Sequence, residues 1–150
     1  MDGTVEMDNF YETTVRVRYA ETDQMGVVYY ANYLIWFEIG RVETFRQMGF
    51  SYKEMEEASD SYAMVAEARC RYLKPALYDD VVCIRTRVVE SRRRTLRFGY
   101  EILREATGEI LATGETVHVI CDGQGHAKAL PDEYRKYFPL TPQPDPEPAR

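Results

Sequence analysis

Asp23 is the residue of this sequence that is best placed for catalysis. Its carboxylate lies in a polar, loop-like segment, shortly before an apolar stretch that begins near Asn32. If that stretch is a helix, the free backbone N–H groups of its first turn can stabilise a developing oxyanion. A carboxylate beside such a turn could attack a carbonyl carbon or activate a water molecule.

A simpler explanation of Asp23 is structural. Asp side chains in loops commonly accept a hydrogen bond from the backbone a residue or two further on, and so close a turn. For an isolated Asp this role is the more frequent one. The sequence on either side of Asp23 therefore has to decide between a turn residue and a catalytic acid.

Two further carboxylates, Glu38 and Glu43, lie inside the apolar stretch and are alternative catalytic acids. They stand three residues before Arg41 and Arg46, a spacing at which opposite charges pair along one helix. We therefore expect each Glu to form an intrahelical ion pair.

The histidines and cysteines do not form a recognisable site. His118 falls in a strand-like segment and His126 in a glycine-rich turn, so both are expected to be structural or exposed. Cys70, Cys83 and Cys121 are odd in number and widely spaced, which favours buried free thiols over disulfides or a metal site. The sequence predicts neither a metal nor a redox cofactor.

Arg92, Arg93 and Arg94 form the only run of three basic residues in the chain. The net charge of −6 and the pI near 5.0 disfavour binding to nucleic acid or to an anionic membrane. An anionic ligand would need a local basic cluster of this kind, since Arg makes bidentate contacts with phosphate. From charge alone, a solvated turn between two strands is the simpler explanation.

The stretch from Asn32 to Met48 is expected to be a helix. It contains no proline, its apolar residues cover most of a helical wheel, and Gly49 is placed to end it. A helix that is apolar nearly all round belongs inside a core. Other elements must therefore wrap it.

The wrapping elements are expected to be strands, because their composition is β-rich or alternating and turn residues separate them. These strands are predicted at residues 13–19, 62–72, 81–89, 95–104 and 110–122. Short links between long neighbouring strands imply antiparallel pairing. The predicted fold class is α+β, with one long buried helix in a curled antiparallel sheet.

Two finer expectations concern side-chain direction and the C-terminal part of the chain. In strand 62–72, the series Met64, Ala66, Ala68 and Cys70 alternates with charged residues, so we expect it to face the helix. A short second helix is expected over residues 131–137, where a proline occupies the first position.

The 150 residues are sufficient for one domain. We expect a leader over residues 1–12, a domain over 13–138 and a proline-rich tail over 139–150 that is unfolded or polyproline-like. With 45% hydrophobic and 13% aromatic residues, the chain is expected to be soluble and globular. No signal peptide or bilayer-spanning run is readable, so a cytoplasmic location is expected.

The residues around Asp23 resemble a known family. The run from Arg18 to Tyr33, RYAETDQMGVVYYANY, is followed by Trp36, Glu38 and Arg41. It closely resembles the 4-hydroxybenzoyl-CoA thioesterase family, which includes short-chain acyl-CoA thioesterases associated with the Tol-Pal system. The resemblance continues through residues 72–76, 113–116 and 130–131, and covers roughly residues 13–138.

This resemblance implies a hotdog fold, in which an antiparallel sheet wraps a long helix, in agreement with the pattern of the sequence. It also implies homodimers that pair sheets edge to edge, often assembled into homotetramers, with active sites at subunit interfaces. The implied activity is hydrolysis of an acyl-CoA or aromatic acyl-CoA thioester. Coenzyme A is then part of the substrate, and no cofactor is implied.

By motif position, Asp23 would be the catalytic carboxylate, and the backbone N–H of Tyr30 would polarise the thioester carbonyl. Gly26 would let the chain and the substrate approach closely. Tyr29 and Tyr33 would line an acyl pocket, although aromatic residues at a helix entrance are more often core. Many short-chain members have His where this sequence has Tyr30, whereas the 4-hydroxybenzoyl enzyme has Tyr, so the resemblance does not carry short-chain specificity.

The resemblance also bears on Arg92, Arg93 and Arg94, because this strand connection lies near the CoA nucleotide in the family. Two alternatives remain open. A hotdog dehydratase or hydratase would use an Asp–His arrangement, and no His follows Asp23 in the motif. A non-hydrolytic acyl-CoA-binding protein would keep the fold without turnover.

Overall fold

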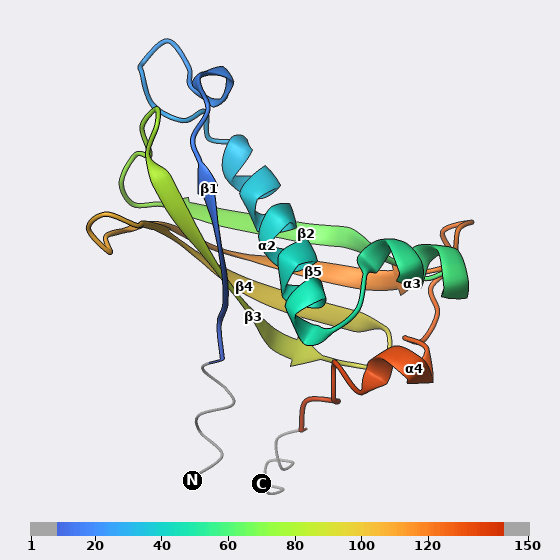
Figure 1. The fold of residues 1–150 in the computed structure, drawn as a ribbon. Coiled ribbons are helices and arrows are strands. Elements are labelled where there is room, and N and C mark those ends of the chain that lie inside the picture. The colour runs from blue at the N-terminus through green and yellow to red at the C-terminus, as the bar shows by residue number, and fades with distance from the viewer. Residues whose placement is uncertain (1–8, 143–150) are drawn as a thin grey trace, which may run out of the picture.

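The computed structural model describes residues 9–142. Figure 1 shows one sheet with a long helix across it. The elements are β1 (Tyr11–Arg16), the 3₁₀ turn η1 (Tyr19–Glu21), α2 (Asn32–Met48), α3 (Tyr52–Ser59), β2 (Tyr62–Tyr72), β3 (Val81–Ser91), β4 (Thr95–Arg104), β5 (Ile110–Cys121) and α4 (Asp132–Arg135).

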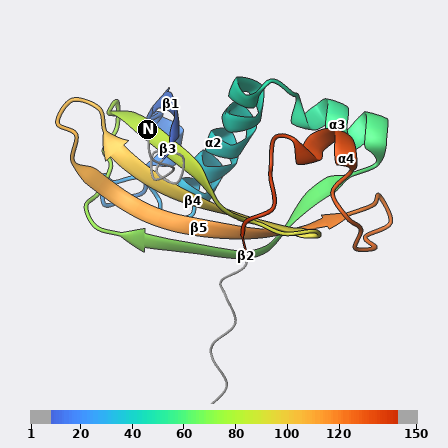
Figure 2. The ribbon, with the colours of Figure 1, turned by 90° about the horizontal axis from the view of Figure 1, so that it is seen from below.

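The sheet has five strands in the order β1-β3-β4-β5-β2, and every neighbouring pair is antiparallel. The sheet curls around α2 on its concave side, and α3 and α4 lie on that same side (Figure 2). This arrangement confirms the predicted α+β hotdog fold. No helix within residues 9–142 is long and apolar enough to cross a bilayer.

The core forms between α2 and the concave face of the sheet. The ring of Phe37 stacks on that of Tyr100 at a centroid distance of 4.3 Å. Gly114 allows this contact, since a Cβ added there would lie 2.5 Å from both the Phe37 ring and the carbonyl oxygen of Arg69. Only part of the apolar surface that the sequence placed all round the helix is buried in this way, because Leu34 and Ile35 are 40% and 47% exposed in the single chain.

The helix α2 has the bounds predicted from the sequence, and Gly49 ends it with a φ of 115°. The sequence analysis missed α3, which begins after Ser51, whose Oγ accepts a hydrogen bond from the backbone N–H of Glu54. The predicted C-terminal helix is shorter, because it covers only Asp132–Arg135.

The first strand lies earlier than predicted. It begins at Tyr11, inside the predicted leader, and ends at Arg16, which pairs with Val81 at the first position of β3. Beyond Arg16 the chain has no partner strand, so Tyr19 falls in η1 instead. Most of the predicted leader and of the proline-rich tail lies outside the described residues.

The predicted direction of the β2 side chains holds for only part of the series. Ala68 and Cys70 pair with Thr116 and Gly114, on the face toward α2, whereas Met64 pairs with Val119 on the other face. Met64 is 52% exposed, and Ala66 and Ala68 are exposed too. A bulge between Val65 and Glu67 shifts the pairing with β5, and α2 lies mainly over β1 and β3 rather than over this edge. Much of β2 is consequently exposed in the single chain, although Ala63 and Cys70 pack against the core.

Candidate active site

Asp23 lies in a tight loop between η1 and α2. Thr22 forms a bridge with Val28, and the backbone N–H of Asp23 donates to the carbonyl oxygen of Val27 at 2.9 Å. Gly26 has a φ of 78°, a left-handed conformation that glycine adopts without steric cost, and its N–H donates to the carbonyl oxygen of Asp23. The glycine therefore closes the loop on the acid.

Only one of the two carboxylate oxygens of Asp23 forms a hydrogen bond within this turn. Its Oδ1 accepts a hydrogen bond of 2.9 Å from the backbone N–H of Met25, which is the turn-closing bond expected of a structural Asp. Within the described residues, Oδ2 has no hydrogen-bond partner. One oxygen therefore orients the side chain, and the other is free to react.

The N-terminus of α2 presents two free backbone donors. The bonds that begin the helix run from the N–H groups of Asn32, Tyr33 and Leu34 to the carbonyl oxygens of Tyr29, Tyr30 and Ala31. In the described part of the chain, the N–H groups of Tyr30 and Ala31 have no acceptor, and no side chain caps the helix. These groups are suited to hold a developing oxyanion.

Tyrosine rings surround this turn. Tyr29 and Tyr30 are 45% and 61% exposed, and their ring centroids lie 4.7 Å apart. Interaction with Tyr30 is the main cause that raises the pKa of Tyr29, and the charge of Asp23 contributes a smaller part. The exposed rings of Tyr29 and Tyr30 therefore lie against each other at the start of α2.

Tyr33 does not line an open pocket, contrary to the expectation. It is 3% exposed, and its ring packs against Trp36 and Tyr72 at centroid distances of 4.8 and 5.0 Å. Its hydroxyl accepts a hydrogen bond from the backbone N–H of Ala76. Tyr33 is thus a core residue that supports the neighbouring loop.

That loop, residues 73–80, follows β2 and packs against the loop of Asp23. The N–H of Val28 donates to the carbonyl oxygen of Ala76 at 2.9 Å, and Val27 forms a bridge with Leu77. Sequence reasoning recognised residues 72–76 as the turn that ends a strand and as part of the family pattern. The role of the 73–80 loop in supporting the Asp23 loop depends on these long-range backbone contacts.

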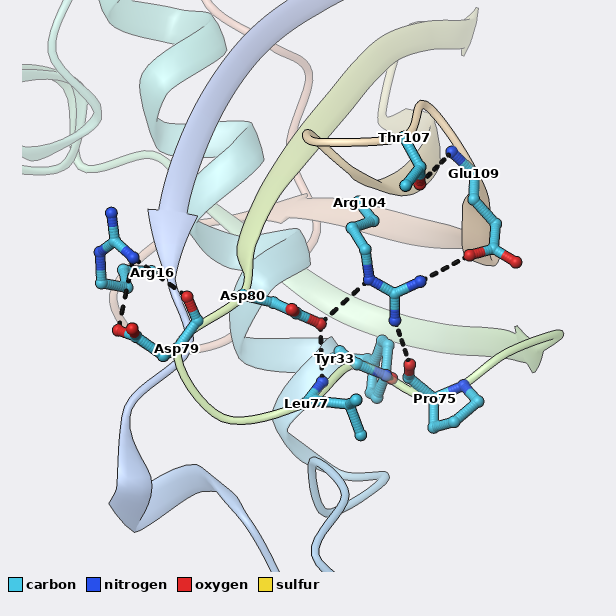
Figure 3. Close-up of polar contacts among 10 residues, drawn as sticks. Arg16, Tyr33, Pro75, Leu77, Asp79, Asp80, Arg104, Thr107 and Glu109 are labelled. Atoms are coloured by element: carbon cyan, nitrogen blue, oxygen red, sulfur yellow. Dashed lines mark hydrogen bonds and ion pairs between the residues drawn. The ribbon is translucent and has the colours of Figure 1, made fainter.

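Arg104 anchors the 73–80 loop from β4 (Figure 3). Its guanidinium contacts Asp80 Oδ2 at 3.1 Å, Glu109 Oε2 at 2.5 Å and the carbonyl oxygen of Pro75 at 2.8 Å. Asp80 Oδ2 also accepts from the backbone N–H of Leu77. The sequence analysis missed this anchor, because Arg104 is 24 residues from one partner and 29 from another.

The basic run at Arg92, Arg93 and Arg94 lies at the opposite end of the sheet from Asp23. The start of β3 lies near the Asp23 loop, since the carbonyl oxygen of Asp80 accepts a hydrogen bond from the backbone N–H of Val17. The basic run follows the other end of β3, directly after Ser91. A strand of this length extends about 30 Å. One chain therefore does not bring the basic run to Asp23.

Part of the basic run is engaged locally. Arg92 Nε pairs with Glu90 Oε1 at 2.7 Å. Arg135 donates to the carbonyl oxygens of Arg92 and Arg93, and so joins this turn to α4. All three side chains of the run are exposed, as a solvated turn or a ligand-binding turn would both require.

The alternative helical carboxylates differ from one another. Glu43 forms the expected ion pair with Arg46. Glu38 does not pair with Arg41 within the described residues, and Arg41 donates to the hydroxyl of Tyr100 at 3.1 Å instead. A pocket of about 200 Å³ opens at this place, and its lining residues are Glu38, Arg41, Val42, Phe45, Tyr52 and Ala63.

His118 is buried and is held by two contacts, one of them with Ala63, which lines that pocket. Its Nδ1 lies 3.1 Å from the carbonyl oxygen of Ala63, and its Nε2 lies 2.8 Å from Thr116 Oγ1. Burial, with a smaller contribution from the positive charge of Arg41, lowers the pKa of His118 to about 4. A neutral ring fixed in this way is structural, as expected.

His126 is exposed and contacts Asp122 at 3.4 Å, and the three cysteines are free thiols, of which only Cys121 is fully buried. No three His, Cys, Asp or Glu side chains between residues 9 and 142 gather in a way that could hold a metal ion.

Comparison with known proteins identifies the family to which the chain is similar. Residues 17–138 match the model of the thioesterase-like superfamily. The chain is 35% identical over 125 residues to the Bacillus subtilis protein YneP, a match that covers 83% of this chain and 87% of YneP. It is 32% identical over 134 residues to the Haemophilus influenzae acyl-CoA thioesterase YbgC, with 88% and 96% of the two chains covered.

A solved structure has the same fold. The crystal structure of a DHNA-CoA thioesterase from Staphylococcus aureus superposes with a TM-score of 0.77 and 33% identity, over 87% of this chain and 84% of that one.

Proposed function

Because this chain belongs to the thioesterase-like superfamily and is an acyl-CoA thioesterase, we propose that Asp23 is the carboxylate that drives its hydrolysis of thioesters. One observation carries this assignment. Among residues 9–142, the acid has a carboxylate oxygen without a partner, in the loop that leads to the unpartnered N–H groups of Tyr30 and Ala31. A nucleophilic or basic group and an oxyanion site are the two parts that acyl transfer requires.

The reaction converts an acyl-CoA and water into a carboxylic acid and free CoA thiol. As a general base, Asp23 would take a proton from water while the resulting hydroxide attacks the thioester carbon. As a nucleophile, Asp23 would form a mixed anhydride and release the CoA thiolate, and water would then cleave the anhydride. Both routes pass through a tetrahedral oxyanion.

The oxyanion would be held by the backbone N–H of Tyr30, with that of Ala31 beside it. A single oxyanion donor contributes about 3 to 4 kcal/mol to transition-state stabilisation in favourable enzymes. Gly26 supports this arrangement, because its left-handed conformation allows the short loop between acid and helix. The exposed ring of Tyr29 would contact the acyl group.

We further propose that the active unit is at least a dimer, paired along the free edge of β2. Tyr72, at the end of β2, lies at the Asp23 end of the sheet, since its hydroxyl contacts the carbonyl oxygen of Tyr30. Tyr62, at the start of β2, pairs with Cys121 at the opposite end. Antiparallel pairing of two β2 strands would therefore place the Asp23 loop of one chain near the far end of the other.

In such a dimer, the basic run of one chain would approach the Asp23 site of its partner. We propose that Arg93 and Arg94, with Arg92, bind phosphate groups of CoA there. Arg93→Ala with Arg94→Ala should then raise KM for acyl-CoA at least fivefold, but should leave hydrolysis of a truncated thioester without the nucleotide unchanged. Equal effects on both substrates would refute this role.

The assigned chemistry is tested by thiol release from short-chain, long-chain and aromatic acyl-CoAs, with the native chain and Asp23→Asn. Asn keeps the shape and the hydrogen bond from Met25 but removes the charge. We expect kcat to fall at least a hundredfold in the variant and KM to change little. Full activity in Asp23→Asn would transfer the role to Glu38, whereas binding of acyl-CoA without turnover in the native chain would identify a binding protein.

The same panel identifies the acyl group that the enzyme prefers. A further arm with acyl carrier protein thioesters separates the two classes of thioester. Dehydration or hydration of the acyl chain without thiol release would identify the dehydratase alternative. The cytoplasmic location stays a prediction from the sequence.

A further inference from the structure

Glu21 is a buried acid that the reaction as described above does not use. It lies two residues before Asp23 and is 6% exposed. Burying a carboxylate is unfavourable unless its oxygens are hydrogen-bonded, so its contacts need an explanation. Those contacts join the segments that carry the acid and the oxyanion donors.

Both carboxylate oxygens of Glu21 accept hydrogen bonds. Oε1 accepts from the backbone N–H of Arg18 at 2.8 Å and lies 3.4 Å from its Nε. Oε2 accepts from the indole N–H of Trp36 at 3.1 Å. Trp36 lies in the first half of α2 and is 1% exposed, so the acid is fixed directly to the body of the helix.

The main chain of Glu21 makes a second set of contacts with the start of α2. Its carbonyl oxygen accepts from the backbone N–H of Tyr29 at 2.8 Å and from Asn32 Nδ2 at 2.8 Å. These two partners bracket the free N–H groups of Tyr30 and Ala31. Glu21 thus contacts the chain on both sides of the oxyanion donors and leads directly into the Asp23 loop.

We propose that Glu21 is a positioning residue that sets the distance between Asp23 and the N–H groups of Tyr30 and Ala31. This inference rests on the proposed function of Asp23. The carboxylate suits the task because each of its oxygens can accept a hydrogen bond from a different element. A Gln amide has only one acceptor, so in Glu21→Gln either Arg18 or Trp36 must lose its partner.

The experiment combines kinetics with fluorescence. Trp36 is the only tryptophan of the chain, so its emission reports on the contact with Glu21. In Glu21→Gln we expect altered emission and a 10- to 100-fold lower kcat, because a shift of about 1 Å in reacting groups can cost about a hundredfold in rate. We expect KM to change less than threefold, since the substrate-contacting side chains remain.

Two controls separate positioning from charge and from general destabilisation. Glu21→Asp keeps the charge but is too short to contact both donors, so it should also lose at least tenfold in kcat. Glu57→Gln removes an exposed acid of α3 that lies 4.0 Å from Lys53, and it should keep native kcat and emission. If Glu21→Gln does not fold, Trp36→Phe removes one of the same bonds and should lower kcat three- to tenfold.

Native kcat in Glu21→Gln, despite altered emission, would overturn the inference. Full recovery of kcat with a stabilising osmolyte would overturn it too, because it would reveal only a loss of folded protein. The activity of Asp23→Asn distinguishes a failure of the proposed function from a failure of the role of Glu21. If that variant is fully active the proposed function fails, whereas if it is inactive and Glu21→Gln is active only the role of Glu21 fails.

Discussion

The hydroxyl of Tyr72, the last residue of β2, donates a hydrogen bond of 2.8 Å to the carbonyl oxygen of Tyr30. The two residues are 42 positions apart, and the bond joins the edge strand to the turn that carries the oxyanion donors. The orientation of the peptide units in that turn therefore depends on the edge of the sheet as well as on α2.

We expect Tyr72→Phe to lower kcat about three- to tenfold. One hydrogen bond contributes about 1 kcal/mol, and here that energy orients the turn at Tyr30. The measurement is steady-state thiol release with the acyl-CoA that the native enzyme prefers. Tyr78→Phe is the matched control, since Tyr78 is 57% exposed and its ring contacts Tyr19 rather than the turn at Tyr30. Equal losses in both variants would argue against the role of the hydroxyl.

Arg104→Met should destabilise the fold and impair activity together. The substitution leaves Asp80, Glu109 and the carbonyl oxygen of Pro75 without their common partner, in a site where the Arg side chain is only 19% exposed. We expect the free energy of unfolding to fall by about 2 kcal/mol, less than for a fully buried pair. Denaturant unfolding measures this change.

Arg46→Met is the control for Arg104→Met, because its pair with Glu43 is exposed. Its free energy of unfolding should change by less than about 0.5 kcal/mol. If Arg104→Met were no more destabilised than this control, the anchoring role of Arg104 would be wrong.

Gly114→Ala should be strongly destabilising, because the new Cβ would lie 2.5 Å from the carbonyl oxygen of Arg69 and from the ring of Phe37. The carbonyl belongs to the sheet backbone and cannot move aside. We expect a loss of about 3 kcal/mol in the free energy of unfolding, at the upper end for overpacked sites. Gly99→Ala serves for comparison, since its Cβ would meet only side-chain atoms at 3.0 Å or more. A larger loss at Gly99 would contradict this account of the packing.

His118 should make the stability depend on pH in the acidic range. Its folded pKa of about 4 lies below its ordinary value of 6.5, mainly because of burial. Between these values the unfolded chain binds a proton that the folded chain does not, so stability falls as the pH is lowered from about 6.5 to 4. The contribution amounts to about 3 kcal/mol.

His118→Gln isolates this contribution. Carboxyl groups such as those of Glu90, Glu109 and Asp122, whose pKa values are lowered, also lose stabilisation in acid, in the variant as in the native chain. The curve of unfolding free energy against pH should therefore be flatter in the variant between pH 6.5 and 4. Parallel curves would show that His118 is not the neutral buried group described above.

Local patterns in the sequence were sufficient for several elements. The bounds of α2, β2 and β4 match the prediction, and β3 and β5 differ from it by one or two residues. The helical period, the β-rich runs and the turn residues act over a few neighbouring positions, so a single sequence contains that information. The spacing of Asp23, Gly26 and Tyr30 was equally visible, because all three belong to one short segment.

Other features depended on which elements come together in space. The partial exposure of β2, the burial of Tyr33 and the contact of Arg41 with Tyr100 follow from how α2 lies on the sheet. The burial of a side chain depends on residues far away in the sequence, so alternation along one strand did not reveal it.

The candidate site likewise combines features that are local in the sequence with features that depend on tertiary contacts. The sequence by itself determined a carboxylate, a glycine and a helix N-terminus in the right order, and the left-handed conformation of that glycine came from the structure. Only the tertiary structure fixed Glu21 to α2, because its contact with Trp36 joins residues 15 positions apart, whereas its contact with Arg18 lies within the η1 turn. It likewise placed the basic run at the opposite end of the sheet from Asp23, since a β-strand separates the residues at its two ends by its full length.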